Sequence, residues 1–508
     1  MPRAAHGLSS PTDVCGATHC QPRRVRRQSF QTDRLATQRY IRAFERGRGL
    51  ATSVVMADRT PLVVIVGGGF AGLAAAKALR HAPVRVLLID RSNHHLFQPL
   101  LYQVAISTLS PAQIAAPLRQ ILHRQQQTTV IMGEVVGVDK ERKLVFVNSP
   151  DRERVPIEYD YLILATGATH SYFGHQEFEA HAPGLKTLAD AEAVRNKILQ
   201  AFEQAEAEED PLAHRDLLTF VLVGAGPTGV EMAGALAVLI RQSLRSQFRR
   251  IDPTSARIVL VDLGSRVLGT FAEDISEAAK QRLERLGVEI RLGHAVDHID
   301  EDGVIVAGER IVSKTVIWTA GVAPSPAGRW LAVETDRAGR VKIQPDLTVP
   351  GHAEIFVLGD TATLNQDGKP LAGVAQVAMQ QGRYAGRLIQ RRVTGQSAPA
   401  PFRYFDKGNM AVVGAGYAVV QTGPLHMKGI LAWLVWATIH VMYLAAPALR
   451  LSVLGQWMWA FLTRQPGSRL IVSQRETRRT PKLDAQLTEP ANPSNVNQFG
   501  DLKPSAAR

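Results

Sequence analysis

The sequence predicts an α/β protein with two Rossmann-like dinucleotide-binding domains, the second inserted in the first, and a C-terminal amphipathic helical membrane anchor. Three observations support this prediction. Residues 63–79 and 220–232 each show a buried strand, a glycine-rich turn and a helix in succession. A strand pattern that completes the first copy follows at 354–362, after the second copy has ended. Beyond it, residues 429–463 are rich in tryptophan and almost free of charge.

The first glycine-rich turn has the G-x-G-x-x-G spacing. The first glycine permits a tight turn, the second lets the backbone approach a pyrophosphate, and the third lets the helix pack closely on the strand. Asp90 closes the next predicted strand, where its carboxylate can accept hydrogen bonds from ribose hydroxyls. This combination favours dinucleotide binding over a glycine-rich turn that binds nothing. The three glycines are Gly67, Gly69 and Gly72.

The second glycine-rich turn repeats the first. Asp262 again closes the following strand, after a longer interval that a helix reaching about residue 249 would explain. A carboxylate at this place repels a 2′-phosphate, so Asp262 favours NADH over NADPH. Glu231 is expected in the first helical turn, either near the contact between two cofactors or as an acid that only stabilises the helix start. The three glycines are Gly224, Gly226 and Gly229.

Other strands of both modules also end in turns of small residues, at 160–168, 315–322 and 354–362. Small residues permit the close approach of a flat group, and an acid after the last strand can reach a ribityl or ribose hydroxyl. Two dinucleotide-binding modules in one chain indicate two cofactors that face each other, one bound permanently and one passing through. That is the arrangement of a flavoprotein fed by a nicotinamide nucleotide. The residues singled out in these turns are Thr166, Gly167, Gly321, Gly359 and Asp360.

Composition narrows the class of protein. The net charge of +13 is concentrated at the start of the chain, where residues 1–55 hold ten arginines and three acids. This leader is expected to be unstructured, with translation from Met56 or an organelle transit peptide as alternatives. Its charge suits an anionic membrane surface, and no nucleic-acid recognition motif accompanies it. Both cysteines, Cys15 and Cys20, lie in the leader, which excludes a disulfide framework and a redox-active cysteine pair in the body.

With these residues assembled, the chain resembles the type II (non-proton-pumping) NADH:quinone oxidoreductases, over residues 61–475. The resemblance implies an FAD site at Gly67 to Gly72, Asp90 and Gly359-Asp360, and an NADH site at Gly224 to Gly229 and Asp262. The segment His95 to Ala105 is similar to the family's loop near the flavin. A metal site at its two adjacent histidines is the alternative, for which no carboxylate or cysteine stands at ligand spacing.

Two more segments match the family more narrowly. Ala375 to Gly382 has the A-Q-x-A-x-Q-x-G pattern that borders the family's quinone pocket, which implies that Gln376 and Gln380 hydrogen-bond the quinone. Lys407 resembles a family lysine close to the flavin. Without the resemblance, two glutamines at i and i+4 could equally be the polar surface of a helix.

The apolar C-terminal stretch predicts membrane binding. Residues 429–449 carry no charge over 21 positions, which is long enough to span a bilayer, but His440 and Pro447 shorten the unbroken part. At 450–463 the apolar residues have helical amphipathic spacing, so helices lying in the membrane surface are favoured over a spanning one. The aromatic residues expected at the interface are Trp433, Trp436, Tyr443, Trp457 and Trp459.

The resemblance implies that NADH passes hydride to FAD, which then reduces a membrane quinone without proton pumping. The expected location is the cytoplasmic face of the inner or cell membrane, with mitochondrial targeting as the alternative; a homodimer and the choice of ubiquinone or menaquinone are left open. The expected parts are a leader at 1–58, an FAD domain at 59–210 and 329–405, an NADH domain at 211–328, an anchoring region at 406–475 and a disordered tail at 476–508.

Other functions would require different features of the chain. A sulfide:quinone oxidoreductase shares the architecture but needs active-site cysteines, which the body lacks. A soluble reductase of another acceptor needs no tryptophan-rich terminal segment. A flavin-dependent redox sensor, or a nucleic-acid-binding flavoprotein that uses its basic leader, would be separated from the enzyme by deleting residues 1–55, which should leave catalysis intact.

Overall fold

The computed structural model describes residues 60–465 and 467–472. The expectations for the leader at 1–58, including both cysteines, and for the tail at 476–508 therefore lie outside the described residues.

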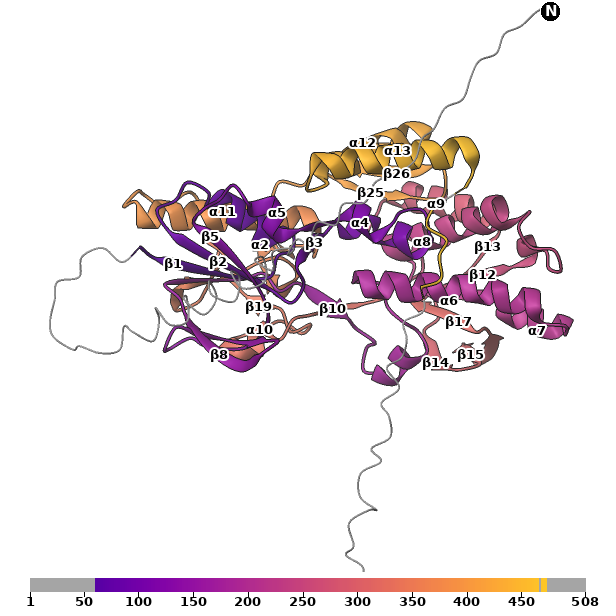
Figure 1. Cartoon of the computed structure of the whole chain (residues 1–508), viewed down its shortest axis with the longest axis horizontal. Helices are drawn as coiled ribbons and strands as arrows, with labels where there is room; N and C mark the ends of the chain where they lie inside the picture. The colour runs from indigo at the N-terminus through magenta and orange to yellow at the C-terminus, as the bar shows by residue number, and fades with distance from the viewer. Residues whose placement is uncertain (1–59, 466, 473–508) are drawn as a thin grey trace, which may run out of the picture. The chain divides into compact units, whose positions relative to one another are not determined.

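The first domain is built on a six-stranded sheet (Figure 1). Short apolar runs form its central strands, and both faces of these strands are buried, as is usual for a parallel sheet. Strand β21, which follows the second domain in sequence, pairs in parallel with β9, which precedes it, so the second domain is inserted in the first. The strand order is β20 (Thr348–Val349), β21 (His352–Val357), β9 (Tyr161–Leu164), β1 (Leu62–Val66), β2 (Arg85–Asp90) and β5 (Thr128–Met132).

Two helices, α2 (Phe70–Ala78) and α11 (Ala375–Val393), pack closely together beside this sheet. The close packing depends on glycines in α11. A Cβ atom added at Gly382 would lie 2.1 Å from the carbonyl oxygen of Ala71, and one at Gly386 would lie 2.6 Å from Cβ of Ala78. Any larger residue at these positions would push the two helices apart.

The inserted domain repeats the plan with a four-stranded parallel sheet and the helix α8 (Pro227–Val238). The helix continues as a π-helical segment at Leu239–Leu244, and a short 3-10 turn follows at Pro253–Ser255. The helix before Asp262 is therefore extended as expected, but it ends at Leu244 rather than at about residue 249. The strand order is β13 (Val288–Leu292), β12 (Arg257–Asp262), β11 (Thr219–Val223) and β17 (Thr315–Trp318).

The two segments that connect the first domain with the inserted domain pair with each other. Strand β10 (Ala168–His170) leaves the first sheet and β18 (Val322–Pro324) returns from the second, and they form an antiparallel ribbon. The long helix α6 (Leu188–Ala207) follows β10 and contributes to the same hydrophobic core as the inserted sheet.

The C-terminal region packs on the inserted domain. A three-stranded antiparallel sheet of β25 (Asn409–Val412), β26 (Ala418–Thr422) and β27 (Leu425–Gly429) leads into helices α12 (Ile430–Tyr443) and α13 (Pro447–Thr463). The two helices lie side by side (Figure 1). Buried residues of these strands and helices belong to the core cluster that contains the inserted sheet.

The uncharged stretch at 429–449 is not one helix. It is interrupted after Tyr443, and α13 starts at Pro447, the residue type suited to the first helical position. Among the helices at 60–465 and 467–472, none combines the length and apolarity needed to cross a bilayer.

Both terminal helices present apolar side chains to solvent. Leu431 and Met442 of α12 are 65% and 64% exposed, and Phe461 and Leu462 of α13 are 71% and 70% exposed. The expected interfacial aromatics differ in exposure. Trp459 is 59% exposed, whereas Trp436 is 1% exposed and stacks on the half-buried Trp457, which packs against the core.

Candidate functional site

The first glycine-rich turn forms an open cradle at the start of α2. Gly67 has a φ of +103°, and a Cβ atom at Gly72 would lie 1.9 Å from the carbonyl oxygen of Gly67. These two glycines are therefore required by the turn itself. A Cβ atom at Gly69 would meet nothing within 4 Å, so the backbone there faces open space. Such space at a helix N-terminus is where a pyrophosphate would lie.

Asp90 braces this cradle. Its carboxylate accepts hydrogen bonds from the backbone N–H of Gly68 at 2.6 Å and from the Ser92 backbone N–H and hydroxyl, both at 2.7 Å. A carboxylate has about four lone-pair sites, so capacity remains for a ribose hydroxyl. The sequence did not identify His95 as a partner of the same turn. Its Nδ1 atom lies 2.9 Å from the Gly68 carbonyl oxygen, and its ring packs on Phe70.

The turns at 166–167 and 359–361 meet beside the cradle. The hydroxyl of Thr361 donates to the carbonyl oxygen of Gly167 at 3.0 Å and lies 3.3 Å from the hydroxyl of Thr166, which also contacts that of Ser325. A Cβ atom at Gly167 would meet nothing within 4 Å, so this turn also faces open space.

Asp360 stands at the same place with a largely buried side chain. Burial raises the pKa of its carboxyl, against the opposing effects of Lys186 and Arg340. Within the part of the chain that the structure describes, no hydrogen bond reaches this carboxyl. Gly359 beside it has a φ of +70°, and its N–H donates to the buried Gln381 side chain at 2.7 Å. Gln381 was missed by the sequence analysis because nothing in the pattern separates it from Gln376 and Gln380.

The second cradle reproduces the first. Gly224 has a φ of +109°, and a Cβ atom at Gly229 would lie 1.8 Å from the Gly224 carbonyl oxygen, whereas one at Gly226 would meet nothing within 4 Å. Asp262 accepts from the N–H of Ala225 and that of Gly264, both at 2.5 Å. Gly321, after β17, has a φ of +68°.

Glu231 is not in the first turn of α8, as the sequence analysis expected. The helix starts at Pro227, so Glu231 lies in the second turn, where the helix dipole offers little stabilisation. Its side chain is 8% exposed and accepts a long hydrogen bond, 3.4 Å, from the N–H of Val412. Burial raises the pKa of Glu231 to about 8. At neutral pH the carboxyl is therefore mostly protonated.

A short buried network links the region of Glu231 to α13. The indole N–H of Trp457 donates to Gln103 Oε1 at 2.7 Å, and Gln103 Nε2 donates to the hydroxyl oxygen of Tyr102 at 3.0 Å. Burial and the nearby Glu231 both raise the pKa of Tyr102. This network was not predicted from the sequence, because Trp457 lies 354 residues after Gln103.

Gln376, Gln380 and Lys407 are brought together around the segment 405–408. Gln376 Nε2 donates to the carbonyl oxygen of Gly408 at 3.0 Å, while its Oε1 is buried and has no hydrogen-bond partner among the described residues. Gln380 donates to the carbonyl oxygen of Phe405 at 2.8 Å and accepts from its N–H at 3.0 Å. Lys407 donates to the hydroxyl of Tyr443 in α12 at 3.1 Å.

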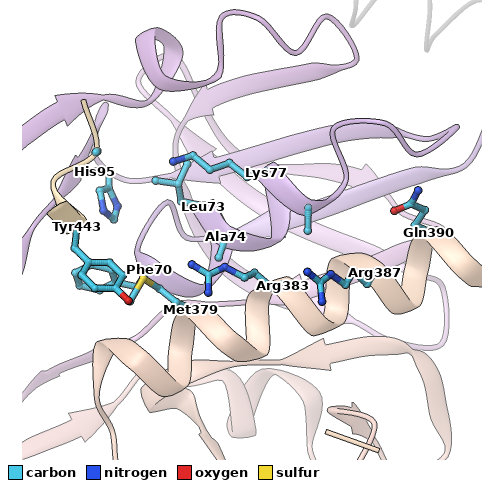
Figure 2. Close-up of a pocket in the computed structure, with 12 residues that line it drawn as sticks. Phe70, Leu73, Ala74, Lys77, His95, Met379, Arg383, Arg387, Gln390 and Tyr443 are labelled. Carbon is cyan, nitrogen blue, oxygen red and sulfur yellow. The ribbon is translucent and has the colours of Figure 1, made fainter. Parts of the chain in front are cut away.

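A cavity of about 440 Å³ lies between α2, α11 and the end of α12. Tyr443, which Lys407 contacts, lines this cavity, whereas Gln376, Gln380 and Lys407 are not among its lining residues. Figure 2 shows its aromatic end, formed by Phe70, His95 and Tyr443 beside Met379, and its continuation along the two helices. No group of three metal-ligating side chains occurs at 60–465 or 467–472. In particular His95 is engaged with Gly68 and Phe70 rather than with other ligands.

Comparisons with known proteins agree with this geometry. A family model of pyridine nucleotide-disulphide oxidoreductases matches residues 61–382. The type II NADH:quinone oxidoreductase Ndh of Mycobacterium tuberculosis is 44% identical over 430 residues, covering 82% of this chain and 92% of the relative. A type II NADH:quinone oxidoreductase of Staphylococcus aureus is 28% identical, covering 73% and 93%.

Solved structures share the fold. The structure of NDH2 from Plasmodium falciparum in complex with NADH matches with a TM-score of 0.74 at 19% identity, covering 82% of this chain and all of that one. The sulfide:quinone oxidoreductase of Aquifex aeolicus matches with a TM-score of 0.62 at 16% identity, covering 80% and 92%.

Proposed function

Because the chain belongs to the pyridine nucleotide-disulphide oxidoreductases and, within them, to the type II NADH:quinone oxidoreductases, we propose that it oxidises NADH and reduces a membrane quinone through FAD. The observation that carries this proposal is the pair of open cradles of one plan in a single chain, at Gly69 and at Gly226.

The residues of the first cradle fit FAD. Open space at Gly69 and Gly167 leaves room for a pyrophosphate and a flat ring, Asp90 would hold the ribose, and Asp360 offers a carboxyl to a ribityl or ribose hydroxyl. Bound FAD would supply the redox centre between NADH and the quinone. Thr166 belongs to the hydroxyl cluster that fixes the turn beside this space.

The second cradle would receive NADH. Gly226 leaves room for its pyrophosphate, and Asp262, at the end of β12, disfavours a 2′-phosphate. Gly321 would shape the turn that faces the nicotinamide half. Glu231 holds a proton on its carboxyl below about pH 8, and quinone reduction consumes protons, so we assign this residue to proton supply near the two cofactors.

We assign different roles to the two glutamines at the quinone. The amide of Gln376 has one buried oxygen without a partner among the described residues and one remaining N–H, so it can bind a carbonyl or hydroxyl group directly. Gln380 is already held by the backbone of Phe405, so it would act by shaping the pocket wall. Lys407, fixed on Tyr443, would place a positive charge at the pocket edge.

The membrane would meet the protein at α12 and α13. Their exposed apolar side chains lack any protein cover in the described structure, and long helices for spanning are absent from that part, so we propose that they lie in the bilayer surface. The cytoplasmic face is the side on which NADH would be available.

The test is a two-step absorbance experiment on protein purified in detergent. NADH added without oxygen should bleach the flavin absorbance, and a quinone should restore it. Sulfide should cause no bleaching, because the chain's two cysteines both lie in the leader. Bleaching by NADH with no recovery on quinone addition would instead favour a soluble reductase of another acceptor.

A further inference from the structure

The cavity beside α12 continues into a groove with three cations. Lys77 stands on α2, and Arg383 and Arg387 lie along α11 at the same cavity (Figure 2). The groove floor between them is apolar and small, formed by Leu73 and Ala74. One end of the groove is thus aromatic and the other is cationic.

These cations have no counter-charge. Among the described residues, no ion pair or hydrogen bond engages the side chains of Lys77, Arg383 or Arg387. Two neighbours on α11 differ: Arg391 donates to the carbonyl oxygen of Ser397, and Arg392 pairs with Asp346 at 3.1 Å. The last arginines of α11 are thus held by an ion pair or a hydrogen bond, whereas the described residues provide no such partner for the arginines of the groove.

The cations also repel each other. Burial lowers the pKa of Lys77, and Arg383 and Arg450 lower it further. All three residues are exposed, so water screens their repulsion, and a single anion placed among them would attract all three at once.

The position of the groove identifies the source of that anion. Tyr443 and Ala445, at the junction of α12 and α13, line its aromatic end. Met442, next to Tyr443, is 64% exposed, and Leu434, about two turns earlier, is 50% exposed. A ligand whose anionic group binds the cations would therefore also reach the exposed apolar surface of α12, at the other end of the groove.

We propose that this groove binds the phosphate headgroup of an anionic phospholipid, with its acyl chains along α12. A phospholipid meets both demands, because one molecule carries an anion for Lys77, Arg383 and Arg387 and apolar chains for α12. This inference rests on the proposed contact of α12 and α13 with the membrane.

The test compares vesicle binding of flavin-loaded variants. The triple variant Lys77→Gln, Arg383→Gln, Arg387→Gln removes the groove charges. Its control, Arg152→Gln, Arg337→Gln, Lys369→Gln, removes three exposed charges from other elements of the same domain. Figure 1 places β8 (Arg152–Glu158), which carries Arg152, on the other side of the sheet from α11.

Vesicles of phosphatidylcholine alone are compared with vesicles that also contain phosphatidylglycerol. The triple variant should bind the mixed vesicles roughly a hundredfold more weakly than wild type, since each surface cation contributes about a fivefold gain. Its binding to phosphatidylcholine should be unchanged. An equal loss in the control variant would show general attraction and overturn the groove site.

Two further experiments distinguish a lipid from free phosphate and test the membrane contact of α12 separately. Native mass spectrometry should find one phosphatidylglycerol retained by wild type and the control but not by the triple variant. Displacement of that lipid by inorganic phosphate at equal concentration would assign the groove to free phosphate and overturn the proposal. Replacing Leu431 and Leu434 by Ser should weaken binding to both vesicle types; if it does not, the membrane contact of α12 fails, independently of the groove.

Discussion

The two dinucleotide cradles share their backbone but differ in what surrounds them. In both, an aspartate at the end of the second strand accepts from the N–H that follows the first glycine. In the first cradle the side chain of Leu118 covers Gly68 so closely that a Cβ atom there would lie 2.5 Å from it. In the second, Ala225 takes the place of Gly68 and is 2% exposed within the hydrophobic core. The turn is therefore buried in both cradles, but by different neighbours.

The following helices differ as well. Counting from the first glycine, Lys77 of α2 corresponds to Gly234 of α8, and Ala74 corresponds to Glu231. The C-terminal sheet covers α8 at this place, since a Cβ atom at Gly234 would lie 2.7 Å from the N of Gly414. The same face of α2 is left open as the groove. The covered face of α8 therefore holds the buried acid Glu231, and the open face of α2 holds the cation Lys77.

The largest effect is expected from a substitution in the first cradle. Gly69→Val should abolish flavin binding, because the added side chain would fill the space left for the pyrophosphate. The fold should survive, since Gly69 has a φ of −70° and its Cβ position is free. Flavin absorbance per protein and circular dichroism measure the two outcomes. A yellow, active Gly69→Val protein would show that the flavin lies elsewhere.

The matching change in the second cradle should separate the two cofactors. Gly226→Val should keep its flavin but slow flavin reduction by NADH by at least about a hundredfold, because only the NADH pyrophosphate loses its place. Stopped-flow absorbance without quinone measures that rate. Dithionite, which needs no nucleotide site, should still bleach the variant. Flavin loss here with retention in Gly69→Val would mean that the two modules are reversed.

Much of this comparison could be predicted from sequence. The repeated glycine spacing and the strand-ending acids predicted both modules, because these features are local and are required by the turn itself. The covering of α8 by β25 and β26 could not be predicted, since it depends on packing between distant segments. For the same reason the sequence treated Gln376 and Gln380 as equivalent, although only Gln380 is held at both ends by Phe405. The error at Glu231 has a local cause instead, because α8 begins at Pro227 and Glu231 falls in its second turn.

A moderate effect is expected on the quinone side. Gln376→Leu and Gln380→Leu together should slow quinone turnover by about one to two orders of magnitude, as each lost hydrogen bond is worth roughly 0.5–1.5 kcal/mol. Flavin reduction by NADH should hardly change. As a single substitution, Gln376→Leu should weaken quinone binding directly, whereas Gln380→Leu should also increase proteolysis near Phe405. A double variant impaired in the NADH half-reaction instead would remove the quinone from this place.

The smallest effect concerns Glu231, the acid that the first copy replaces by Ala74. Because the pKa of Glu231 is about 8 in the folded protein, the folded chain binds this proton more tightly than the unfolded chain does. This contribution to the free energy of unfolding is fully present below the ordinary carboxyl pKa and is lost as the pH rises through about 8. Glu231→Gln stays neutral, so its melting temperature relative to wild type should increase between pH 5 and pH 9. Thermal melts of the flavin-loaded proteins measure the trend, with the exposed Glu277→Gln of α9 (Glu273–Arg285) as the control. A difference that does not change with pH would mean that Glu231 is ionised in the folded protein, and the proton supply assigned to it would be lost.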